Sequence, residues 1–107
     1  MKSFHLMLAA GLALLIGGLG MSGSANAHVF GKCARQENFE LKLEACEAAS
    51  RLTSFPWVLH WVYREMARAY RARGEISSAA AAYRKSLSAS ERAAVRQEME
   101  QLVVLTQ

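Results

Sequence analysis

The residues of this 107-residue chain that could carry out catalysis are few. All nine acidic side chains are glutamates, no aspartate occurs, and the three histidines are His5, His28 and His60. No Gly-x-Ser-x-Gly turn is present, and no spacing of a nucleophile, a base and an orienting group indicates a catalytic set. The sequence therefore predicts a protein that is not an enzyme and holds no cofactor.

A second group of residues has side chains suited to binding. Its members are Trp61, Arg64, Arg68 and Arg71. Steps of three, four and three residues place all four on one stripe of a helix. Arginine holds carboxylates through paired hydrogen bonds, and a tryptophan beside the row can stack on a side chain. An acidic peptide or the C-terminus of another protein is one expected ligand. The alternative is a solvated face partly neutralised by Glu65 and Glu75.

The overall charge points less clearly to a partner. The chain has 13 basic and 9 acidic residues, a net charge of +4. Without residues 1–27, which contain only Lys2 among the charged residues, the net charge is 12 − 9 = +3, spread over several segments. No nucleic-acid motif is present, so nucleic acid is not an expected partner.

The first 27 residues are typical of a secretory signal peptide. Lys2 and His5 precede an apolar run from Leu6 to Leu19, and Ala25-Asn26-Ala27 matches the small-x-small pattern of a signal-peptidase site. The run is shorter than the roughly 20 residues that cross a bilayer as a helix. We expect cleavage after Ala27, a single mature domain over 28–107, a periplasmic or secreted location, and membrane contact only through the uncleaved signal. Retention as an anchor is the alternative.

Export affects how the two cysteines are interpreted. An oxidising compartment favours a disulfide between Cys33 and Cys46, closing a loop of about 14 residues and contributing about 3 kcal/mol. We expect 33–37 to be extended and to fold back along a helix that begins after Asn38. A buried free Cys46 with an exposed Cys33 is the alternative.

Cleavage after Ala27 would also free the α-amine of His28. That amine and the His28 imidazole could chelate copper(II), with His60 as the only available second imidazole. Copper binding is thus an alternative function. The simpler interpretation places His60 on a helix surface.

Apolar periodicity over the rest of the sequence predicts four helices and no strand. They cover Asn38–Leu52, Trp57–Arg73 and Ile76–Ser88, and a last helix that begins near Ser90-Glu91. Pro56 and Gly74 mark the boundaries between the first three. Short connections make neighbouring helices antiparallel, so the fold class is all-α, built of helical hairpins. Trp57 and Trp61 are expected to pack on the first of these helices.

The second and third predicted helices resemble a tetratricopeptide repeat. Residues 60–91 contain the pattern Tyr63-x-x-Met66-Ala67-x-x-Tyr70-x-x-x-Gly74-x-x-x-x-Ala79-x-x-x-Tyr83-x-x-Ser86-Leu87, which matches the family in its aromatic, small and glycine positions. The usual terminal proline is missing, and Glu91 lies near its place. Cys46-x-x-Ala49 stands 37 residues before Tyr83-x-x-Ser86 and is similar to half of a second repeat, although Lys42 replaces the usual alanine.

The resemblance implies a short solenoid closed by a C-terminal capping helix. It also implies that Trp61, Arg64, Arg68 and Arg71 face a groove, because the first helix of each hairpin lines the groove in this family. The expected function is a non-enzymatic protein–protein interaction module, a small adaptor or assembly subunit. A self-associating structural subunit of the cell envelope is the alternative, and a homo-oligomer is compatible with both.

Overall fold

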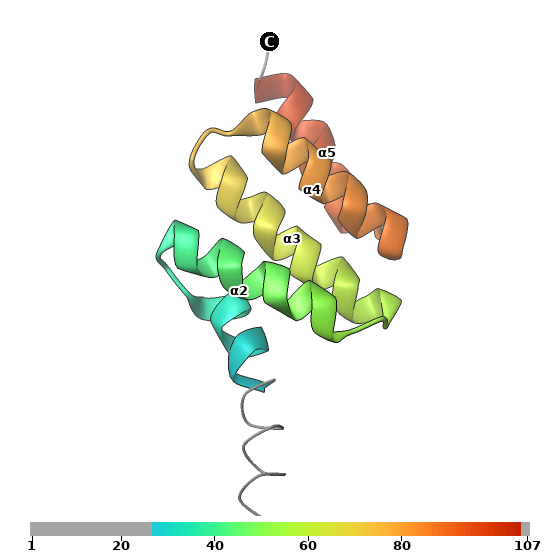
Figure 1. The fold of residues 1–107 in the computed structure, drawn as a ribbon. Coiled ribbons are helices and arrows are strands. Elements are labelled where there is room, and N and C mark those ends of the chain that lie inside the picture. The colour runs from blue at the N-terminus through green and yellow to red at the C-terminus, as the bar shows by residue number, and fades with distance from the viewer. Residues whose placement is uncertain (1–26, 106–107) are drawn as a thin grey trace, which may run out of the picture.

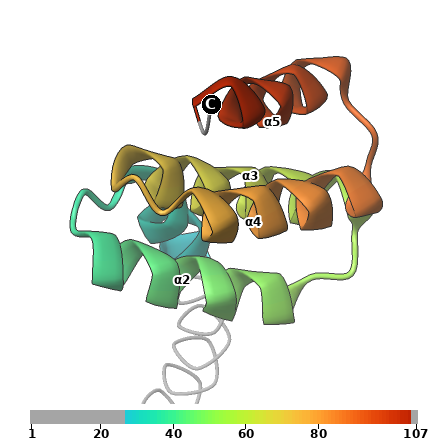
Figure 2. The same ribbon diagram turned by 90° about the horizontal axis from the view of Figure 1, so that it is seen from above.

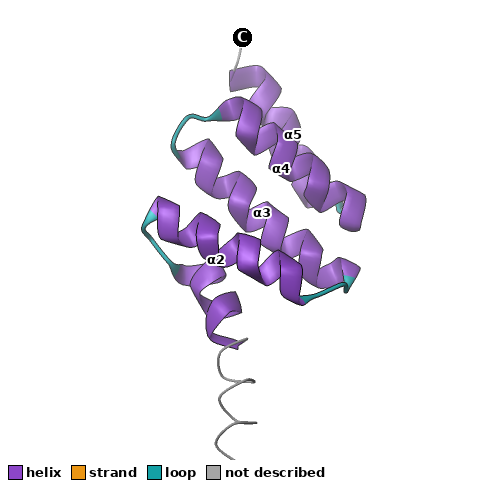
Figure 3. Ribbon diagram, in the orientation of Figure 1, coloured by secondary structure: helices purple, strands orange, loops and turns teal. Residues whose placement is uncertain are grey.

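The computed structural model describes residues 27–105, and every regular element in that range is a helix (Figure 1, Figure 3). A helix over 27–35 precedes α2 (Phe39–Leu52), α3 (Pro56–Ala72), α4 (Ile76–Ala89) and α5 (Ala93–Leu105). The predicted all-α class is confirmed. The predicted signal peptide, apart from Ala27, lies outside the described residues.

The helix over 27–35 was not predicted, and the expectation of an extended segment over 33–37 is wrong at its start. Cys33 lies in this helix and forms a disulfide with Cys46 of α2, with 4.6 Å between the two Cα atoms. Lys42 Nζ donates to the carbonyl oxygens of Cys33 and Ala34, at 2.6 and 3.2 Å. Later residues of the helix thus meet earlier residues of α2, so the two are antiparallel and form a first hairpin.

Local signals in the sequence account for the other helix ends. Asn38 caps α2, since its side chain accepts a hydrogen bond from the Leu41 amide at 3.0 Å. Pro56 occupies the first turn of α3, where its missing N–H costs nothing. Gly74 follows α3 with φ +77°, a conformation in which glycine has no Cβ penalty. These predicted boundaries are confirmed to within one residue.

The second hairpin, α3 and α4, is the most extensively packed pair of helices. Ala67 and Ala79 have no exposed surface, so the two backbones approach closely where these residues lie. Tyr83 is also fully buried and fills the space beside them. The two tightly paired antiparallel helices predicted over 57–88 are confirmed.

The remaining helix, α5, lies against α4, on the side of the second hairpin away from α2 (Figure 2). Val95 and Leu102 are its fully or nearly fully buried residues, and Met99 packs beside them. The helix begins at Ala93, three residues after the predicted Ser90 start, and its Val103 is 59% exposed. The described fold is therefore two hairpins followed by one further helix.

Candidate binding surface

The arginine stripe of α3 faces α5. Arg68 donates two hydrogen bonds to the carboxylate of Glu98, at 2.9 Å from Nε and 2.7 Å from Nη2. One turn further along, Arg71 donates to Gln101 Oε1 at 3.4 Å. The structure thus brings Arg68 and Arg71 together on one face and gives both partners on α5.

Tyr83 of α4 joins the same contact. Its hydroxyl donates to Glu98 Oε1 at 3.0 Å, so the carboxylate bonds to both α3 and α4. The hydrogen bonds from Arg68, and then that from Tyr83, hold the pKa of Glu98 below its ordinary value although burial opposes them. Burial raises the pKa of Tyr83, which therefore stays a neutral donor. Glu98 is ionised at neutral pH and fixes α5 to the second hairpin.

Arg64 differs from its neighbours in the stripe. Its Nε is buried, and no hydrogen-bond acceptor reaches it among residues 27–105. Buried donors of this kind are rare in folded proteins because each costs about 1–3 kcal/mol when unpaired. The positive charge of Arg64 also contributes to lowering the pKa values of His60 and Glu98. Arg64 is thus the stripe's one cation with an unsatisfied buried donor in the part of the chain that the structure describes.

Trp61, one turn before Arg64 on α3, makes an aromatic contact. Its ring makes an edge contact with Phe30 of the helix over 27–35, with 6.3 Å between centroids. Trp57 instead stacks on Phe55 at 6.1 Å and remains 61% exposed. Both tryptophans line a groove with Leu52 of α2, but Trp57 is mostly exposed and the ring contact of Trp61 is with Phe30.

These rings belong to one apolar groove of about 430 Å³ at the end of the molecule where α2 passes into α3. We call its apolar lining the aromatic patch, and its members are Phe30, Leu52, Phe55, Trp57, Val58 and Trp61. Sequence periodicity could not identify it, because it combines the helix over 27–35 with a loop.

His60 is buried, with 6% of its surface exposed, and the expectation of a surface position is wrong. Ser86 Oγ donates to the His60 carbonyl oxygen at 2.7 Å and lies 3.0 Å from His60 Nδ1. A hydroxyl has one hydrogen, so the second contact requires Nδ1–H of His60 to donate to Ser86. Burial, with the charges of Arg92 and Arg64, lowers the pKa of His60, although backbone hydrogen bonds oppose this. The imidazole is thus neutral and serves the α3–α4 interface.

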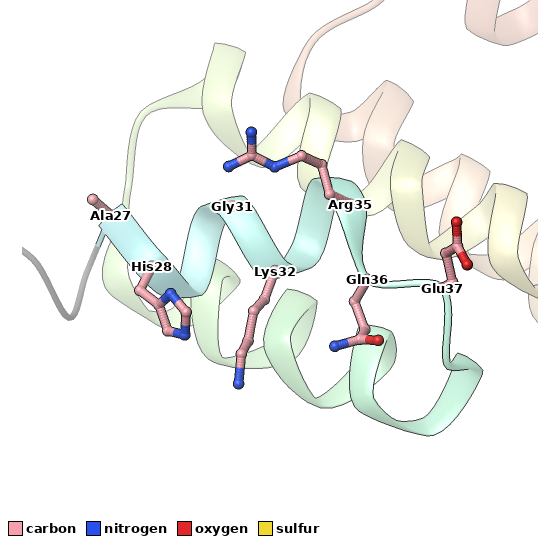
Figure 4. A pocket seen from close by; sticks show the side chains of 7 residues that line it. All are labelled: Ala27, His28, Gly31, Lys32, Arg35, Gln36 and Glu37. Carbon is pink, nitrogen blue, oxygen red and sulfur yellow. The ribbon is translucent and has the colours of Figure 1, made fainter.

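His28 is exposed in the helix over 27–35, beside a shallow hollow (Figure 4). Lys32 and Arg35 follow it along the same hollow. Within 27–105, no three histidine, cysteine or glutamate side chains are grouped as metal ligands.

Lys42 has a role that the sequence did not reveal. Besides its two bonds to the end of the helix over 27–35, its ammonium forms an ion pair with Glu65 of α3 at 3.1 Å. Both side chains are largely buried, with exposed fractions of 13% and 19%. Lys42, which departs from the repeat pattern, therefore connects three helices.

Comparison with known proteins adds no relative: no protein-family profile, curated protein or solved structure matches this sequence. Across 27–105, no helix has the length and apolar character needed to cross a bilayer.

Proposed function

We propose that this protein is an exported, tetratricopeptide-like interaction module that binds an acidic segment of another protein without catalysing a reaction. The periplasm or the extracellular space is its proposed location. The signal-like sequence and the disulfide between Cys33 and Cys46 support that location. The two antiparallel hairpins followed by α5 support the resemblance.

The observation that carries the proposal is the buried Nε of Arg64 without an acceptor. Nε is covered in this conformation, so a carboxylate would supply that acceptor, as a charge-assisted hydrogen bond, after the Arg64 side chain turns toward it. Arg68 lies one turn away, but its charge is balanced by the Glu98 carboxylate, so the proposal depends on the charge of Arg64. A glutamate side chain or a C-terminal carboxylate has the matching chemistry.

The test uses a fluorescently labelled peptide rich in glutamate with a free C-terminal carboxylate, and measures its anisotropy on titration. Arg64→Gln removes the charge and should weaken binding by about tenfold, the cost of one charge-assisted bond. Arg84→Gln is the matched control, because Arg84 is exposed on α4 and lines a different hollow, beside Tyr63.

Equal weakening by both variants would show a response to net charge alone and contradict the proposal. The absence of peptide binding by the native protein would contradict it as well. Charge reversal at Arg68 is avoided, since a glutamate there would repel Glu98 and detach α5.

A further inference from the structure

The aromatic patch exposes large apolar side chains at the connection between α2 and α3. Leu52, Phe55 and Trp57 are 49%, 62% and 61% exposed, although residues of these types usually lie in the core. The stacked pair of Phe55 and Trp57 stands at the connection between α2 and α3. Contiguous exposed apolar surface of this kind marks an interaction site.

The sequence ranges that supply the patch carry positive charges and no negative one, although Glu37 and Glu47 lie just beyond them. Residues 27–36 and 48–64, which supply the patch and its surroundings, contain no aspartate or glutamate. They do contain Arg51, exposed in the last turn of α2, and the exposed Lys32. His28 lies two residues before Phe30 in the sequence. A partner that fits this surface is apolar in its interior and negative at its boundary.

The short distance in sequence between the patch and the signal-like run supports contact with a bilayer. The apolar run Leu6–Leu19 ends eight residues before Ala27, a distance of at most about 28 Å when extended. Phe30 lies within one turn of Ala27. While that run is inserted during export, the patch is therefore held close to the membrane surface.

We propose that the aromatic patch is a lipid-binding surface that rests on an anionic bilayer interface. Phe55 and Trp57 enter the boundary between headgroups and acyl chains, where amphipathic aromatic rings are favoured. Arg51, next to Leu52 in the sequence, and Lys32 face the lipid phosphates, each contributing to attraction near an anionic surface. Membrane contact then extends beyond the signal segment.

A second copy of the protein fits the patch less well. It would bring the same cations against Arg51 and Lys32, which opposes association through this end. A lipid surface brings the opposite charge together with an apolar interior.

The test uses the protein purified from the exported fraction, with its N-terminus established by mass spectrometry and identical in all variants. Co-sedimentation is measured with vesicles of phosphatidylcholine containing about 30 mol% phosphatidylglycerol, and with vesicles of phosphatidylcholine alone. The native protein should bind the anionic vesicles more tightly, with a blue shift of tryptophan emission and weaker binding at high salt.

Two paired variants isolate the patch. Phe55→Ser with Trp57→Ser should lower the partition into anionic vesicles by about tenfold or more, because the exposed apolar area that enters the bilayer is removed. The fold should survive, because both residues are exposed and serine at position 55 is a favoured N-cap for α3. Leu41→Ser with Val104→Ser removes two apolar residues with exposed fractions of 50% and 70% elsewhere, and should leave the partition unchanged.

Three results would overturn the proposal. They are no binding of the native protein to anionic vesicles, equal partition of the two paired variants, and equal binding to neutral and anionic vesicles. A dimer in light scattering that only the Phe55 and Trp57 variant loses, without vesicle binding, would assign the patch to a second copy instead. Peptide binding through Arg64 is measured separately, so the failure of either proposal leaves the other standing.

Discussion

Arg68 and Glu98, thirty residues apart in the sequence, are joined by two hydrogen bonds that connect α3 to α5. The same carboxylate accepts from Tyr83 of α4, so one ion joins three helices. The contact explains how α5, which has few buried apolar residues, is held in place.

Glu98→Gln should therefore lower the free energy of unfolding by about 1 kcal/mol, since the pair is partly exposed and screened by solvent. The measurement is urea denaturation followed by circular dichroism. Glu91→Gln is the control, because Glu91 pairs with Arg96 at an exposed position and should change nothing measurable. Equal losses in the two variants would contradict a special role for Glu98.

The pKa of Glu98 adds a pH dependence to the same contact. Because Arg68 lowers the folded pKa below the ordinary value of about 4.3, the stabilisation is present above that pH. It should be lost as pH falls from there through the folded pKa. In Glu98→Gln this part of the acid dependence of unfolding should disappear.

The buried His60 should give the free energy of unfolding a second, separate dependence on pH. Burial lowers its folded pKa below the unfolded value of about 6.5, so protonation favours the unfolded state. Stability should be fully present above pH 6.5 and should fall as pH drops below it. Urea denaturation between pH 5 and 8 measures this slope.

His60→Asn is the informative variant, because its amide nitrogen can donate to Ser86 in place of Nδ1–H and does not titrate. The slope between pH 5 and 7 should become smaller than in the native protein. An unchanged slope would mean that another group titrates there.

Much of the fold follows from local sequence signals. Asn38, Pro56 and Gly74 set the helix boundaries through caps and backbone preferences, which act within a few residues. The helix over 27–35 has only nine described residues, with Gly31 at its middle, too few turns for a convincing apolar period. Its existence depends on the disulfide and on Lys42, contacts with α2 that no short window contains.

The candidate binding surface was predicted less completely. The spacing of Arg64 and Arg68 correctly placed both on one helical face, because that depends only on the helical repeat. Their different environments depend on α5, whose Glu98 pairs with Arg68 and not with Arg64. Such long-range pairing is set by tertiary packing and leaves no periodic signal in the sequence.

Lys42 should be essential to the first hairpin although the repeat pattern favours alanine at its position. Lys42→Ala removes two bonds to carbonyl oxygens and leaves Glu65 largely buried without its cation. We expect a loss of about 2–4 kcal/mol in the free energy of unfolding. Lys85→Ala, at an exposed site on α4, should cost far less. A Lys42 variant as stable as the native protein would contradict this role.

Breaking the disulfide should release the helix over 27–35 first. Cys33 and Cys46 are 13 residues apart, and opening a loop of this length costs about 3 kcal/mol in the loop-entropy description. The double variant Cys33→Ser with Cys46→Ser should be cleaved faster by trypsin after Lys32 or Arg35, as mass spectrometry of the fragments would show. Cleavage first within α3 would instead indicate that the two hairpins unfold together.

Two glycines should respond to alanine in opposite directions. At Gly74 an added Cβ would meet no atom within 4 Å, but φ is +77°, so Gly74→Ala should destabilise the protein by about 1 kcal/mol through the backbone alone. At Gly31, inside a helix, replacement by alanine should stabilise the protein by about 0.5–1 kcal/mol through its higher helix propensity. The added Cβ would lie 2.9 Å from Nη2 of Arg35, the far end of a flexible side chain that can move aside. Thermal denaturation should therefore give a lower Tm for Gly74→Ala and a higher Tm for Gly31→Ala. A lower Tm in both would show that Arg35 cannot leave its place over Gly31.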